Sequence, residues 1–341
     1  MSKKKFFMVM LALLVTLTLA LTGCSSPAPA ASTGTDKSAD QSNAPAAEKL
    51  KIAMVANASI ADGGWTSACY QAMVAAAEKN GYETAYSENV AQSDYVTMFK
   101  QYADLGYNLV FAPGGEYSDS IKELAPQYPN TGFILLNGTL EGIANVANVM
   151  PNAQQIGYLA GALAGLQTKT NSIGFIGGME LDTTKTKLAS YEAAAKKVNP
   201  NVSVTNAYAG TFDDSAKGKE IATSMVSTKN VDIIFGDASA VDAGAREGLK
   251  TSQNRYSIAQ PGDFLNDDPE TIISSICTDN SALIDVCMKD LAAGKFGNKT
   301  VYGDLSNGCL SIGQFGKNCP QDVQDKYMKV VEEIKGGTFL K

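Results

Sequence analysis

The sequence predicts an α/β protein with two lobes, each a doubly wound parallel sheet, which are joined by crossovers. Short apolar segments alternate with segments whose apolar residues recur at helical spacing, a pattern typical of parallel sheets covered on both faces. The alternation runs through once and restarts near residue 172, which indicates a second lobe of the same construction. The length of 341 residues has room for two domains of about 150 residues each.

The first run of this alternation begins with an apolar strand and a helix that ends at Gly81, a residue type that commonly terminates helices. Its expected strands are 51–56, 83–90, 109–112, 132–136 and 144–149. Its expected helices are 67–80, 94–105, 118–127 and 153–167.

The second run repeats the pattern with strands 172–176, 202–207, 231–235 and 256–259 and helices 186–198, 216–227 and 241–252. After about residue 271, strand-like segments are expected to cross between the lobes before a last helix. The elements expected there are strands 271–275, 300–304 and 310–312 and helices 282–293 and 321–335. We therefore expect lobe 1 at 50–168 plus 277–308 and lobe 2 at 169–276 plus 309–341.

The N-terminus has the pattern of a secretory signal over residues 1–23. Three lysines at positions 3 to 5 precede an apolar run over 6–21, which is shorter than the roughly 20 residues that a membrane span needs. The segment LTGC, ending at Cys24, resembles the bacterial lipobox, which implies a lipid on Cys24; an ordinary cleaved signal is the alternative. Residues 24–49 are rich in Ser, Ala and Pro, and we expect a flexible linker there.

The composition excludes several kinds of function. The chain has no histidine, which excludes Ser-His-Asp and Cys-His catalytic groups and His-ligated zinc. Its net charge is −7, and it has no cluster of basic residues beyond the N-terminal lysines, which argues against nucleic acid as a partner. The glycine-rich segment 174–178 matches neither dinucleotide-binding nor Walker patterns, so no cofactor and no metal are predicted. Carboxylate, lysine or tyrosine chemistry stays open.

The cysteines do not describe a disulfide framework. Five remain besides Cys24, which is an odd number, and none belongs to a CxxC pair. Cys309 and Cys319 flank a glycine-rich loop, and an oxidising compartment would allow them to pair. Whether they do so stays open at this stage.

Polar and aromatic residues gather where the predicted strands end. In open parallel sheets ligands bind beyond these ends, so the residues are candidates for a cleft between the lobes. Trp65, the only tryptophan, either packs under its own glycine-rich loop or stacks on a planar ligand, with Asp62 accepting hydrogen bonds from that ligand. Acids at other tips could bind a metal, hydrolyse a glycosidic bond or simply be solvated. The other candidate ligand-binding residues are Asn57, Asp94, Gly114, Asn137, Phe212, Asp237, Ser239 and Asp263.

Four segments in the right order resemble the basic membrane protein family of ABC-transporter substrate-binding lipoproteins, which includes purine nucleoside receptors. They are 57–66 (NASIADGGWT), 157–164 (GYLAGALA), 173–179 (IGFIGGM) and 208–218 (YAGTFDDSAKG). They resemble the first binding loop, the domain-crossing helix, the opening of the second lobe and the most specific stretch of the family. The resemblance covers about residues 50 to 335, and it implies a type I periplasmic-binding-protein fold that closes on its ligand.

The resemblance also implies the chemistry of the ligand site. In the purine nucleoside receptors two aromatic rings sandwich the base, and acids bind the base edge and the ribose. Asp62 and Trp65 match the first-loop acid and aromatic, Tyr208 or Phe212 would supply the opposing ring, and Asp263 resembles the ribose acid. However, the first loop reads DGGWTS where the nucleoside branch usually reads DKSFNQ, and the ribose-binding lysine has no counterpart in 275–279. A free base is therefore also an option.

Together these features predict a lipid-anchored receptor on the extracytoplasmic side of the cell membrane, which binds a purine nucleoside or nucleobase and does no chemistry. Its expected partner is an ABC permease, and we expect a monomer. A second interpretation is a receptor for another small solute, such as a sugar or an autoinducer. A third, from another class, is a carboxylate-based glycosidase or nucleoside hydrolase.

Overall fold

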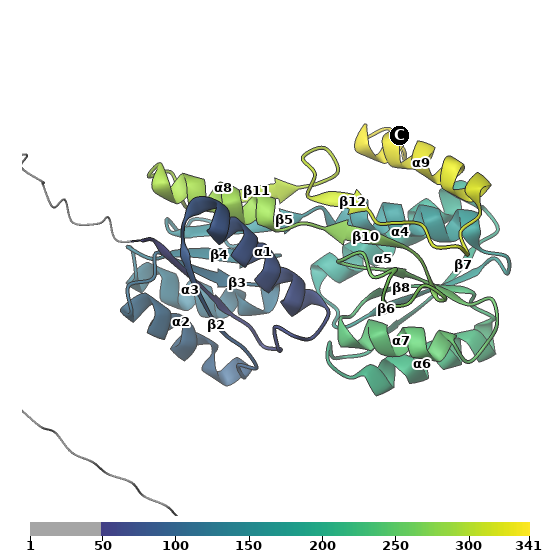
Figure 1. Ribbon diagram of the computed structural model, residues 1–341, viewed down its shortest axis with the longest axis horizontal. Coiled ribbons are helices and arrows are strands. Elements are labelled where there is room, and N and C mark those ends of the chain that lie inside the picture. The colour runs from purple at the N-terminus through teal and green to yellow at the C-terminus, as the bar shows by residue number, and fades with distance from the viewer. Residues whose placement is uncertain (1–48) are drawn as a thin grey trace, which may run out of the picture. The chain divides into compact units, whose positions relative to one another are not determined.

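The computed structural model describes residues 49–341, which form two α/β lobes (Figure 1). The predicted signal 1–23, Cys24 and all but the last residue of the predicted linker lie outside the described residues. Each lobe is built on one six-stranded sheet with helices on both faces. The predicted fold class, two doubly wound lobes of mainly parallel sheet, is confirmed.

Lobe 1 contains the strands β1 (Lys51–Val55), β2 (Glu83–Ser87), β3 (Leu109–Ala112), β4 (Gly132–Leu136), β5 (Val146–Pro151) and β11 (Lys299–Gly303). They lie in the order β11-β5-β4-β3-β1-β2, and every neighbouring pair is parallel. Its helices are α1 (Trp65–Asn80), α2 (Tyr95–Asp104), α3 (Ser118–Leu124) and α8 (Ser281–Ala292). Its 3-10 turns are η1 (Gln92–Asp94), η2 (Gly115–Tyr117) and η3 (Ala125–Gln127).

The two faces of this sheet follow the alternation of side chains along each strand. In β1, Ile52 and Met54 pack in the core formed with α1 and α8, whereas Ala53 and Val55 pack in the core formed with α2 and α3. All four side chains are fully buried. A strand covered on both faces reads as a continuous apolar run, which is why β1, β3 and β4 could be predicted from the sequence.

Lobe 2 contains the strands β6 (Ser172–Gly177), β7 (Ser203–Tyr208), β8 (Ile233–Asp237), β9 (Tyr256–Ala259), β10 (Ile272–Thr278) and β12 (Leu310–Ile312). They lie in the order β12-β10-β9-β8-β6-β7, and β12 runs antiparallel to β10 while the other pairs are parallel. Its helices are α4 (Ala153–Gln167), α5 (Asp182–Val198), α6 (Ser215–Lys229), α7 (Ala240–Leu249) and α9 (Gln321–Lys335). Helices α6 and α7 cover one face, and α4, α5 and α9 cover the other (Figure 1).

Helix α4 packs in lobe 2 against α5 and α9, so the packing places the lobe boundary before this helix and not at residue 168 as predicted. The contact with α5 is close because Gly157, Gly161 and Gly165 lie along the interface. A Cβ added to Gly161 would lie 2.1 Å from the carbonyl oxygen of Tyr191. Apolar spacing locates a helix in the sequence, but it does not tell which sheet the helix covers.

The strand predicted at 271–275 as part of a crossover is instead β10, an inner strand of the lobe 2 sheet beside β9. The chain then passes to lobe 1 for α8 and β11 and returns to lobe 2 for β12 and α9. Together with the passage from β5 to α4, three segments therefore connect the lobes.

The two sheets share one topology, because counted along each lobe the strand order is 2-1-3-4-5 with a sixth strand at the edge. In this order the chain turns in opposite directions on either side of the β1–β3 pair and of the β6–β8 pair. Ligands of doubly wound sheets bind at such switch points, beyond the carboxyl ends of the strands. The loops after β1, β3, β6 and β8 are therefore where a ligand is expected.

The five cysteines of the described residues are free thiols, and Cys309 and Cys319 do not form a disulfide. Both are buried, and burial raises the pKa of the Cys309 thiol to about 12 and that of Cys319 to about 11. Within residues 49–341 we find no helix that is both long enough and apolar enough to cross a membrane.

Candidate ligand-binding site

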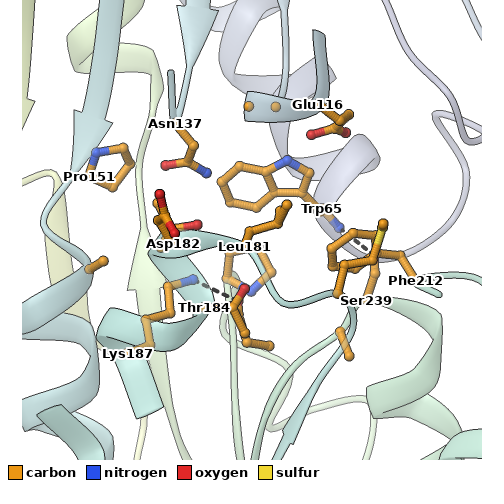
Figure 2. A pocket seen from close by; sticks show the side chains of 18 of the residues that line it. Trp65, Glu116, Asn137, Pro151, Leu181, Asp182, Thr184, Lys187, Phe212 and Ser239 are labelled. Carbon is orange, nitrogen blue, oxygen red and sulfur yellow. Dashed lines mark hydrogen bonds and ion pairs between the residues drawn. The ribbon is translucent and has the colours of Figure 1, made fainter. Parts of the chain in front are cut away.

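A cavity of about 790 Å³ is lined by both lobes at the two switch points (Figure 2). Lobe 1 contributes the segments that follow β1, β3 and β4, and lobe 2 contributes those that follow β6, β7, β8 and β9. This volume lies within the range of about 300–1,000 Å³ that is common for small-molecule sites. The cavity is thus large enough for a ligand of the size of a nucleoside or sugar.

Asp62 holds the start of helix α1 in place. One carboxylate oxygen, Oδ1, accepts hydrogen bonds from the backbone N–H groups of Gly64 at 2.8 Å and Ser67 at 2.9 Å. The other, Oδ2, accepts from the N–H of Thr66 at 3.1 Å. These amides have no partner inside the helix, and a carboxylate at a helix N-terminus is also favoured by the helix dipole. Asp62 lines the cavity, but both of its oxygens already serve α1.

Trp65 is the first residue of α1 and is partly buried at the cavity wall. Its indole Nε1–H donates a hydrogen bond to the Pro113 carbonyl oxygen at 2.6 Å, which ties the loop after β1 to the loop after β3. Because the N–H is used in this way, the ring offers the cavity its apolar surface and not its polar edge. This is the geometry that a stacking contact with a planar group requires.

Glu116, Asn57 and Asn137 form a polar rim beside Trp65. The Asn57 side-chain amide donates a hydrogen bond to Glu116 Oε1 at 3.4 Å. Burial raises the pKa of the Glu116 carboxyl, and Figure 2 shows this side chain above the indole. The Glu116 carboxylate also accepts from its own backbone N–H, and among the described residues no other residue donates to Glu116 Oε2 or bonds to the Asn137 side chain. These groups therefore keep hydrogen-bonding capacity for a ligand that lies on Trp65.

Phe212 and Ser239 face the same region from lobe 2. The Phe212 ring lies against the backbone of Gly178, where an added Cβ would be 2.4 Å from two ring carbons. Ser239 Oγ accepts a hydrogen bond from the backbone N–H of Trp65 at 3.2 Å, which directly links the two lobes. Ser239 adopts a φ of 56°, in the left-handed region that non-glycine residues rarely occupy. Ser239, in this strained backbone conformation, thus makes the hydrogen bond that links the two lobes across the cavity.

The lobe 2 side of the cavity also contains a nearly buried ion pair. Lys187 Nζ lies 2.7 Å from Asp237 Oδ1, and the two side chains are 10% and 16% exposed. Gln260 Nε2 donates hydrogen bonds to the same Asp237 oxygen at 2.9 Å and to the Gly236 carbonyl oxygen at 2.6 Å. All three side chains line the cavity.

Asp242 lies behind this ion pair at the start of α7. Its Oδ2 accepts a hydrogen bond from the Ala238 N–H at 3.0 Å, whereas its buried Oδ1 has no partner within the described residues. Burial raises the pKa of this carboxyl to about 7, with a smaller contribution in the same direction from Asp237. Lys187 and Arg246 oppose the shift.

The charges around the cavity are unequal. The lining contains six acids and a single basic residue, Lys187. The acids are Asp62, Glu116, Asp182, Asp213, Asp237 and Asp242. A ligand that carries a phosphate or a carboxylate would meet this excess of negative charge, so the cavity favours neutral ligands.

Comparison with known proteins identifies the group to which the chain belongs. The family described as ABC transporter substrate-binding protein, PnrA-like, matches residues 49–338. The chain belongs to this family. The resemblance noted in the sequence is thereby confirmed, and the PnrA-like family consists of substrate-binding proteins of ABC transporters.

Two curated relatives differ in the ligand that their names give. The ABC transporter nucleoside-binding protein BmpA of Lactococcus lactis is 28% identical over 84% of this chain and 88% of that protein. A putative ABC transporter glucose-binding protein of Haloferax volcanii is 26% identical over 89% of this chain and 76% of that protein. Similarity at this level establishes the PnrA-like family but does not by itself choose between the two ligands.

A solved structure agrees with the fold. An ABC transporter solute-binding protein from Aeropyrum pernix matches with a TM-score of 0.72 at 19% identity, over 85% of this chain and 98% of that one. The periplasmic-binding-protein fold that the PnrA-like resemblance implied is therefore confirmed. At this identity the match supports the fold alone.

The structure brings most of the predicted site residues to one cavity. Those that line it are Asn57, Asp62, Trp65, Gly114, Asn137, Phe212, Asp237 and Ser239. Asp94 does not line it, because it lies exposed in η1 at the start of α2. Tyr208 does not line it either, and Phe212 is the ring that faces the cavity from this segment.

Asp263, which the PnrA-like resemblance suggested as the ribose acid, also lies outside the cavity. Its Oδ2 accepts a hydrogen bond from the Gln314 backbone N–H at 2.9 Å, and its Oδ1 lies 3.4 Å from Ser275 Oγ. These contacts join the loop after β9 to the segment after β12 and to strand β10. Gln260, just before Pro261, reaches the cavity instead.

Several cavity residues were not predicted from the sequence. Glu116 lies just beyond the predicted strand 109–112, where only Gly114 was named as a candidate, so the signal for it was present. Lys187 falls in the predicted helix 186–198, where a lysine usually faces solvent. The helix in fact begins at Asp182, so this lysine lies in its second turn at the cavity and not at its exposed start. No local pattern in the sequence marks it.

Proposed function

We propose that this protein is the ligand receptor of an ABC importer and that it binds a purine nucleoside or nucleobase in the cavity between its lobes. The observation that carries the proposal is the pairing of Trp65 from lobe 1 with Phe212 from lobe 2 on the lining of one cavity. Two aromatic rings on opposite lobes can hold a planar base only when the lobes are together. Binding and closure are then the same event.

The polar groups beside Trp65 suit the edge of a base. Glu116 Oε2 can accept a hydrogen bond from a ring N–H, and the Asn137 amide can both donate and accept. Glu116 thus takes the role that the sequence suggested for Asp62, whose oxygens are occupied by the amides of α1. The nucleoside-binding relative supports this choice of ligand.

The same proposal assigns the protein no chemistry of its own. The sequence has no histidine, and the lysine of the cavity is paired with Asp237 and not with a nucleophile. We further propose that Cys24 carries a lipid that holds the receptor at the extracytoplasmic face of the cell membrane, where a monomer delivers ligand to its permease. The lipobox resemblance of the LTGC segment supports the anchor.

Isothermal titration calorimetry with guanosine, adenosine, inosine, their free bases and glucose tests the proposal. We expect one purine ligand to bind per chain and to be recovered unchanged by chromatography after long incubation. Tight binding of glucose without any purine would favour the alternative that the Haloferax relative suggests. Steady release of free base from a nucleoside would instead show a hydrolase.

A further inference from the structure

Strand β7 is the outermost strand of the lobe 2 sheet and pairs only with β6 (Figure 1). The backbone N–H groups of Ser203 and Ala209, at the two ends of this strand, each donate a hydrogen bond toward β6 at 2.8 Å. Alternate residues of a strand direct their N–H and C=O groups to opposite sides. The N–H and C=O groups of Val204, Asn206 and Tyr208 therefore point away from the sheet.

These outward-pointing groups form what we call the open edge, residues 204–208. Within residues 49–341, none of the N–H and C=O groups of Val204, Asn206 and Tyr208 has a hydrogen-bond partner. The open edge is bounded on both sides, because the N–H of residue 202 donates to the Asn199 carbonyl oxygen and that of residue 210 to the Gly178 carbonyl oxygen. A row of unpaired backbone groups of this kind is a template for pairing with another strand.

The open edge also lacks the features that usually prevent such pairing. Natural proteins protect sheet edges with charged side chains, proline or very short strands. Strand β7 has six residues with no charge and no proline, and the chain is uncharged throughout 199–212. The other sheet edges of the described residues differ, since β2 begins at Glu83, β11 begins at Lys299 and β12 has only three residues. Strand β7 is thus the edge best suited to pair.

A second copy of this chain fits the open edge by symmetry. Identical strands related by a two-fold axis pair antiparallel, and an axis at Asn206 places Val204 opposite Tyr208 of the second copy. Every N–H and C=O group of the open edge then has a partner, whereas any shift of this register leaves some of them unpaired. A charge in β7 would be repelled by the same charge in the second copy, but the strand has none. An aromatic residue opposite a β-branched one is also a favourable cross-strand pair.

We propose that two copies of this protein associate reversibly through β7, with the two strands antiparallel about a two-fold axis at Asn206, so that the two lobe 2 sheets become one. A single short strand offers fewer hydrogen bonds than the roughly ten of a typical stable interface, so the association is expected at high concentration. Strand β7 does not line the ligand cavity. Each copy therefore still binds and delivers ligand as the monomer of the proposed function.

Sedimentation equilibrium from micromolar to millimolar concentration tests this pairing. The native protein should form a dimer and nothing larger, because each copy has one such edge. Asn206→Lys places two ammonium groups side by side at the axis and should weaken the dimer at least about tenfold. Asn206→Asp should do the same, and an equimolar mixture of the two variants should restore the dimer, since opposite charges then lie at the axis.

A matched control places the same charge outside the open edge. Asn201 is exposed and lies just before β7, so Asn201→Lys should leave the association unchanged. Asn206 is exposed as well, so its variants should keep the native fold, which circular dichroism and the melting temperature check.

Cross-linking tests the position of the axis. Opposed residues of a hydrogen-bonded antiparallel pair have Cα atoms about 5.5 Å apart, a separation that a disulfide can span. Asn206→Cys should therefore form an intermolecular disulfide when oxidised glutathione is the oxidant. Ser203→Cys is the control, because its two copies would lie about 20 Å apart and should not cross-link.

The outcomes also separate this pairing from the proposed function. A native protein that stays monomeric at millimolar concentration, or a dimer that neither charge at Asn206 weakens, would overturn the proposal. Equal cross-linking of Ser203→Cys and Asn206→Cys would show random collision and overturn it too. Calorimetry with guanosine should give Asn206→Lys the native affinity, and a native protein that binds no purine would overturn the proposed function while the dimer remained.

Discussion

At the scale of single residues, Trp65 is held in place by its hydrogen bond to the Pro113 carbonyl oxygen, so the ring surface at the cavity is fixed before any ligand arrives. Stacking of a base on an aromatic side chain contributes about 1–3 kcal/mol. Trp65→Ala should therefore weaken purine binding about tenfold or more, whereas Trp65→Phe, which keeps a ring, should weaken it less.

Calorimetry measures both variants, and the native protein offers a second signal. Trp65 is the only tryptophan of the chain, so its fluorescence should change as the ligand is added. If both the affinity of Trp65→Ala and the native emission stayed unchanged, the ring would pack only under its own loop.

Asp242 makes the stability depend on pH. Burial raises the pKa of its carboxyl from 3.8 to about 7, so between these values the folded protein binds one proton more than the unfolded chain. The free energy of unfolding should therefore fall as pH rises through this window, by about 1.4 kcal/mol per pH unit from this group, and level off above about pH 7. Asp242→Asn cannot ionise, so its stability relative to the native protein should rise from pH 4 to pH 7.

Urea denaturation at intervals between pH 4 and pH 8 measures the difference. Because Asp237, Lys187 and Arg246 are present in both proteins, their own charges largely cancel in the comparison. Parallel stability curves for the native protein and Asp242→Asn would mean that this carboxyl ionises normally.

At the scale of elements, the contact between α4 and α5 depends on glycine. Replacing Gly161 by alanine in an isolated helix would stabilise it by about 1 kcal/mol. Here the added Cβ would lie 2.1 Å from the Tyr191 carbonyl oxygen, and forcing the helices apart costs about 1–3 kcal/mol. Gly161→Ala should therefore lower the free energy of unfolding, against its helix propensity.

Urea denaturation of Gly161→Ala beside Ala189→Leu provides the test. Ala189 is exposed on α5, so the larger side chain there should change stability by less than about 0.5 kcal/mol. A stabilised Gly161→Ala protein would show that the two helices can separate without loss.

At the scale of the whole molecule, the proposed anchor and the binding lobes should be independent. Cys24→Ser should move the protein from the membrane fraction to the soluble fraction and abolish labelling with a radioactive fatty acid. The cavity is formed by residues 57 to 302, so its ligand affinity should stay the same. Fractionation, labelling and calorimetry on one preparation check all three, and a Cys24→Ser protein that remained membrane-bound and labelled would exclude this anchor.

The candidate site was predictable as far as it depends on strand ends. Trp65, Asn137, Phe212 and Asp237 follow apolar runs that are recognisable along the chain, and parallel strands bring their carboxyl ends to one edge. Asp94 and Asp263 follow the same rule but do not reach the cavity. The rule that ligands bind beyond strand ends selects one edge of each sheet. The cavity lies only at the switch points of that edge, and these can be located only when the order of the strands in the sheet is known.

Local pattern alone determined the two-lobed α/β class, because strands that are buried on both faces read as apolar runs and the helices between them carry apolar residues at helical spacing. It also carried the resemblance to the family. The lobe that α4 covers, the capping role of Asp62 and the ion pair between Lys187 and Asp237 depended on the tertiary structure. Each of these depends either on a contact between residues that are distant in sequence or on which of several possible partners a side chain binds. Side-chain spacing along one segment contains no information about which distant segment will pack against it.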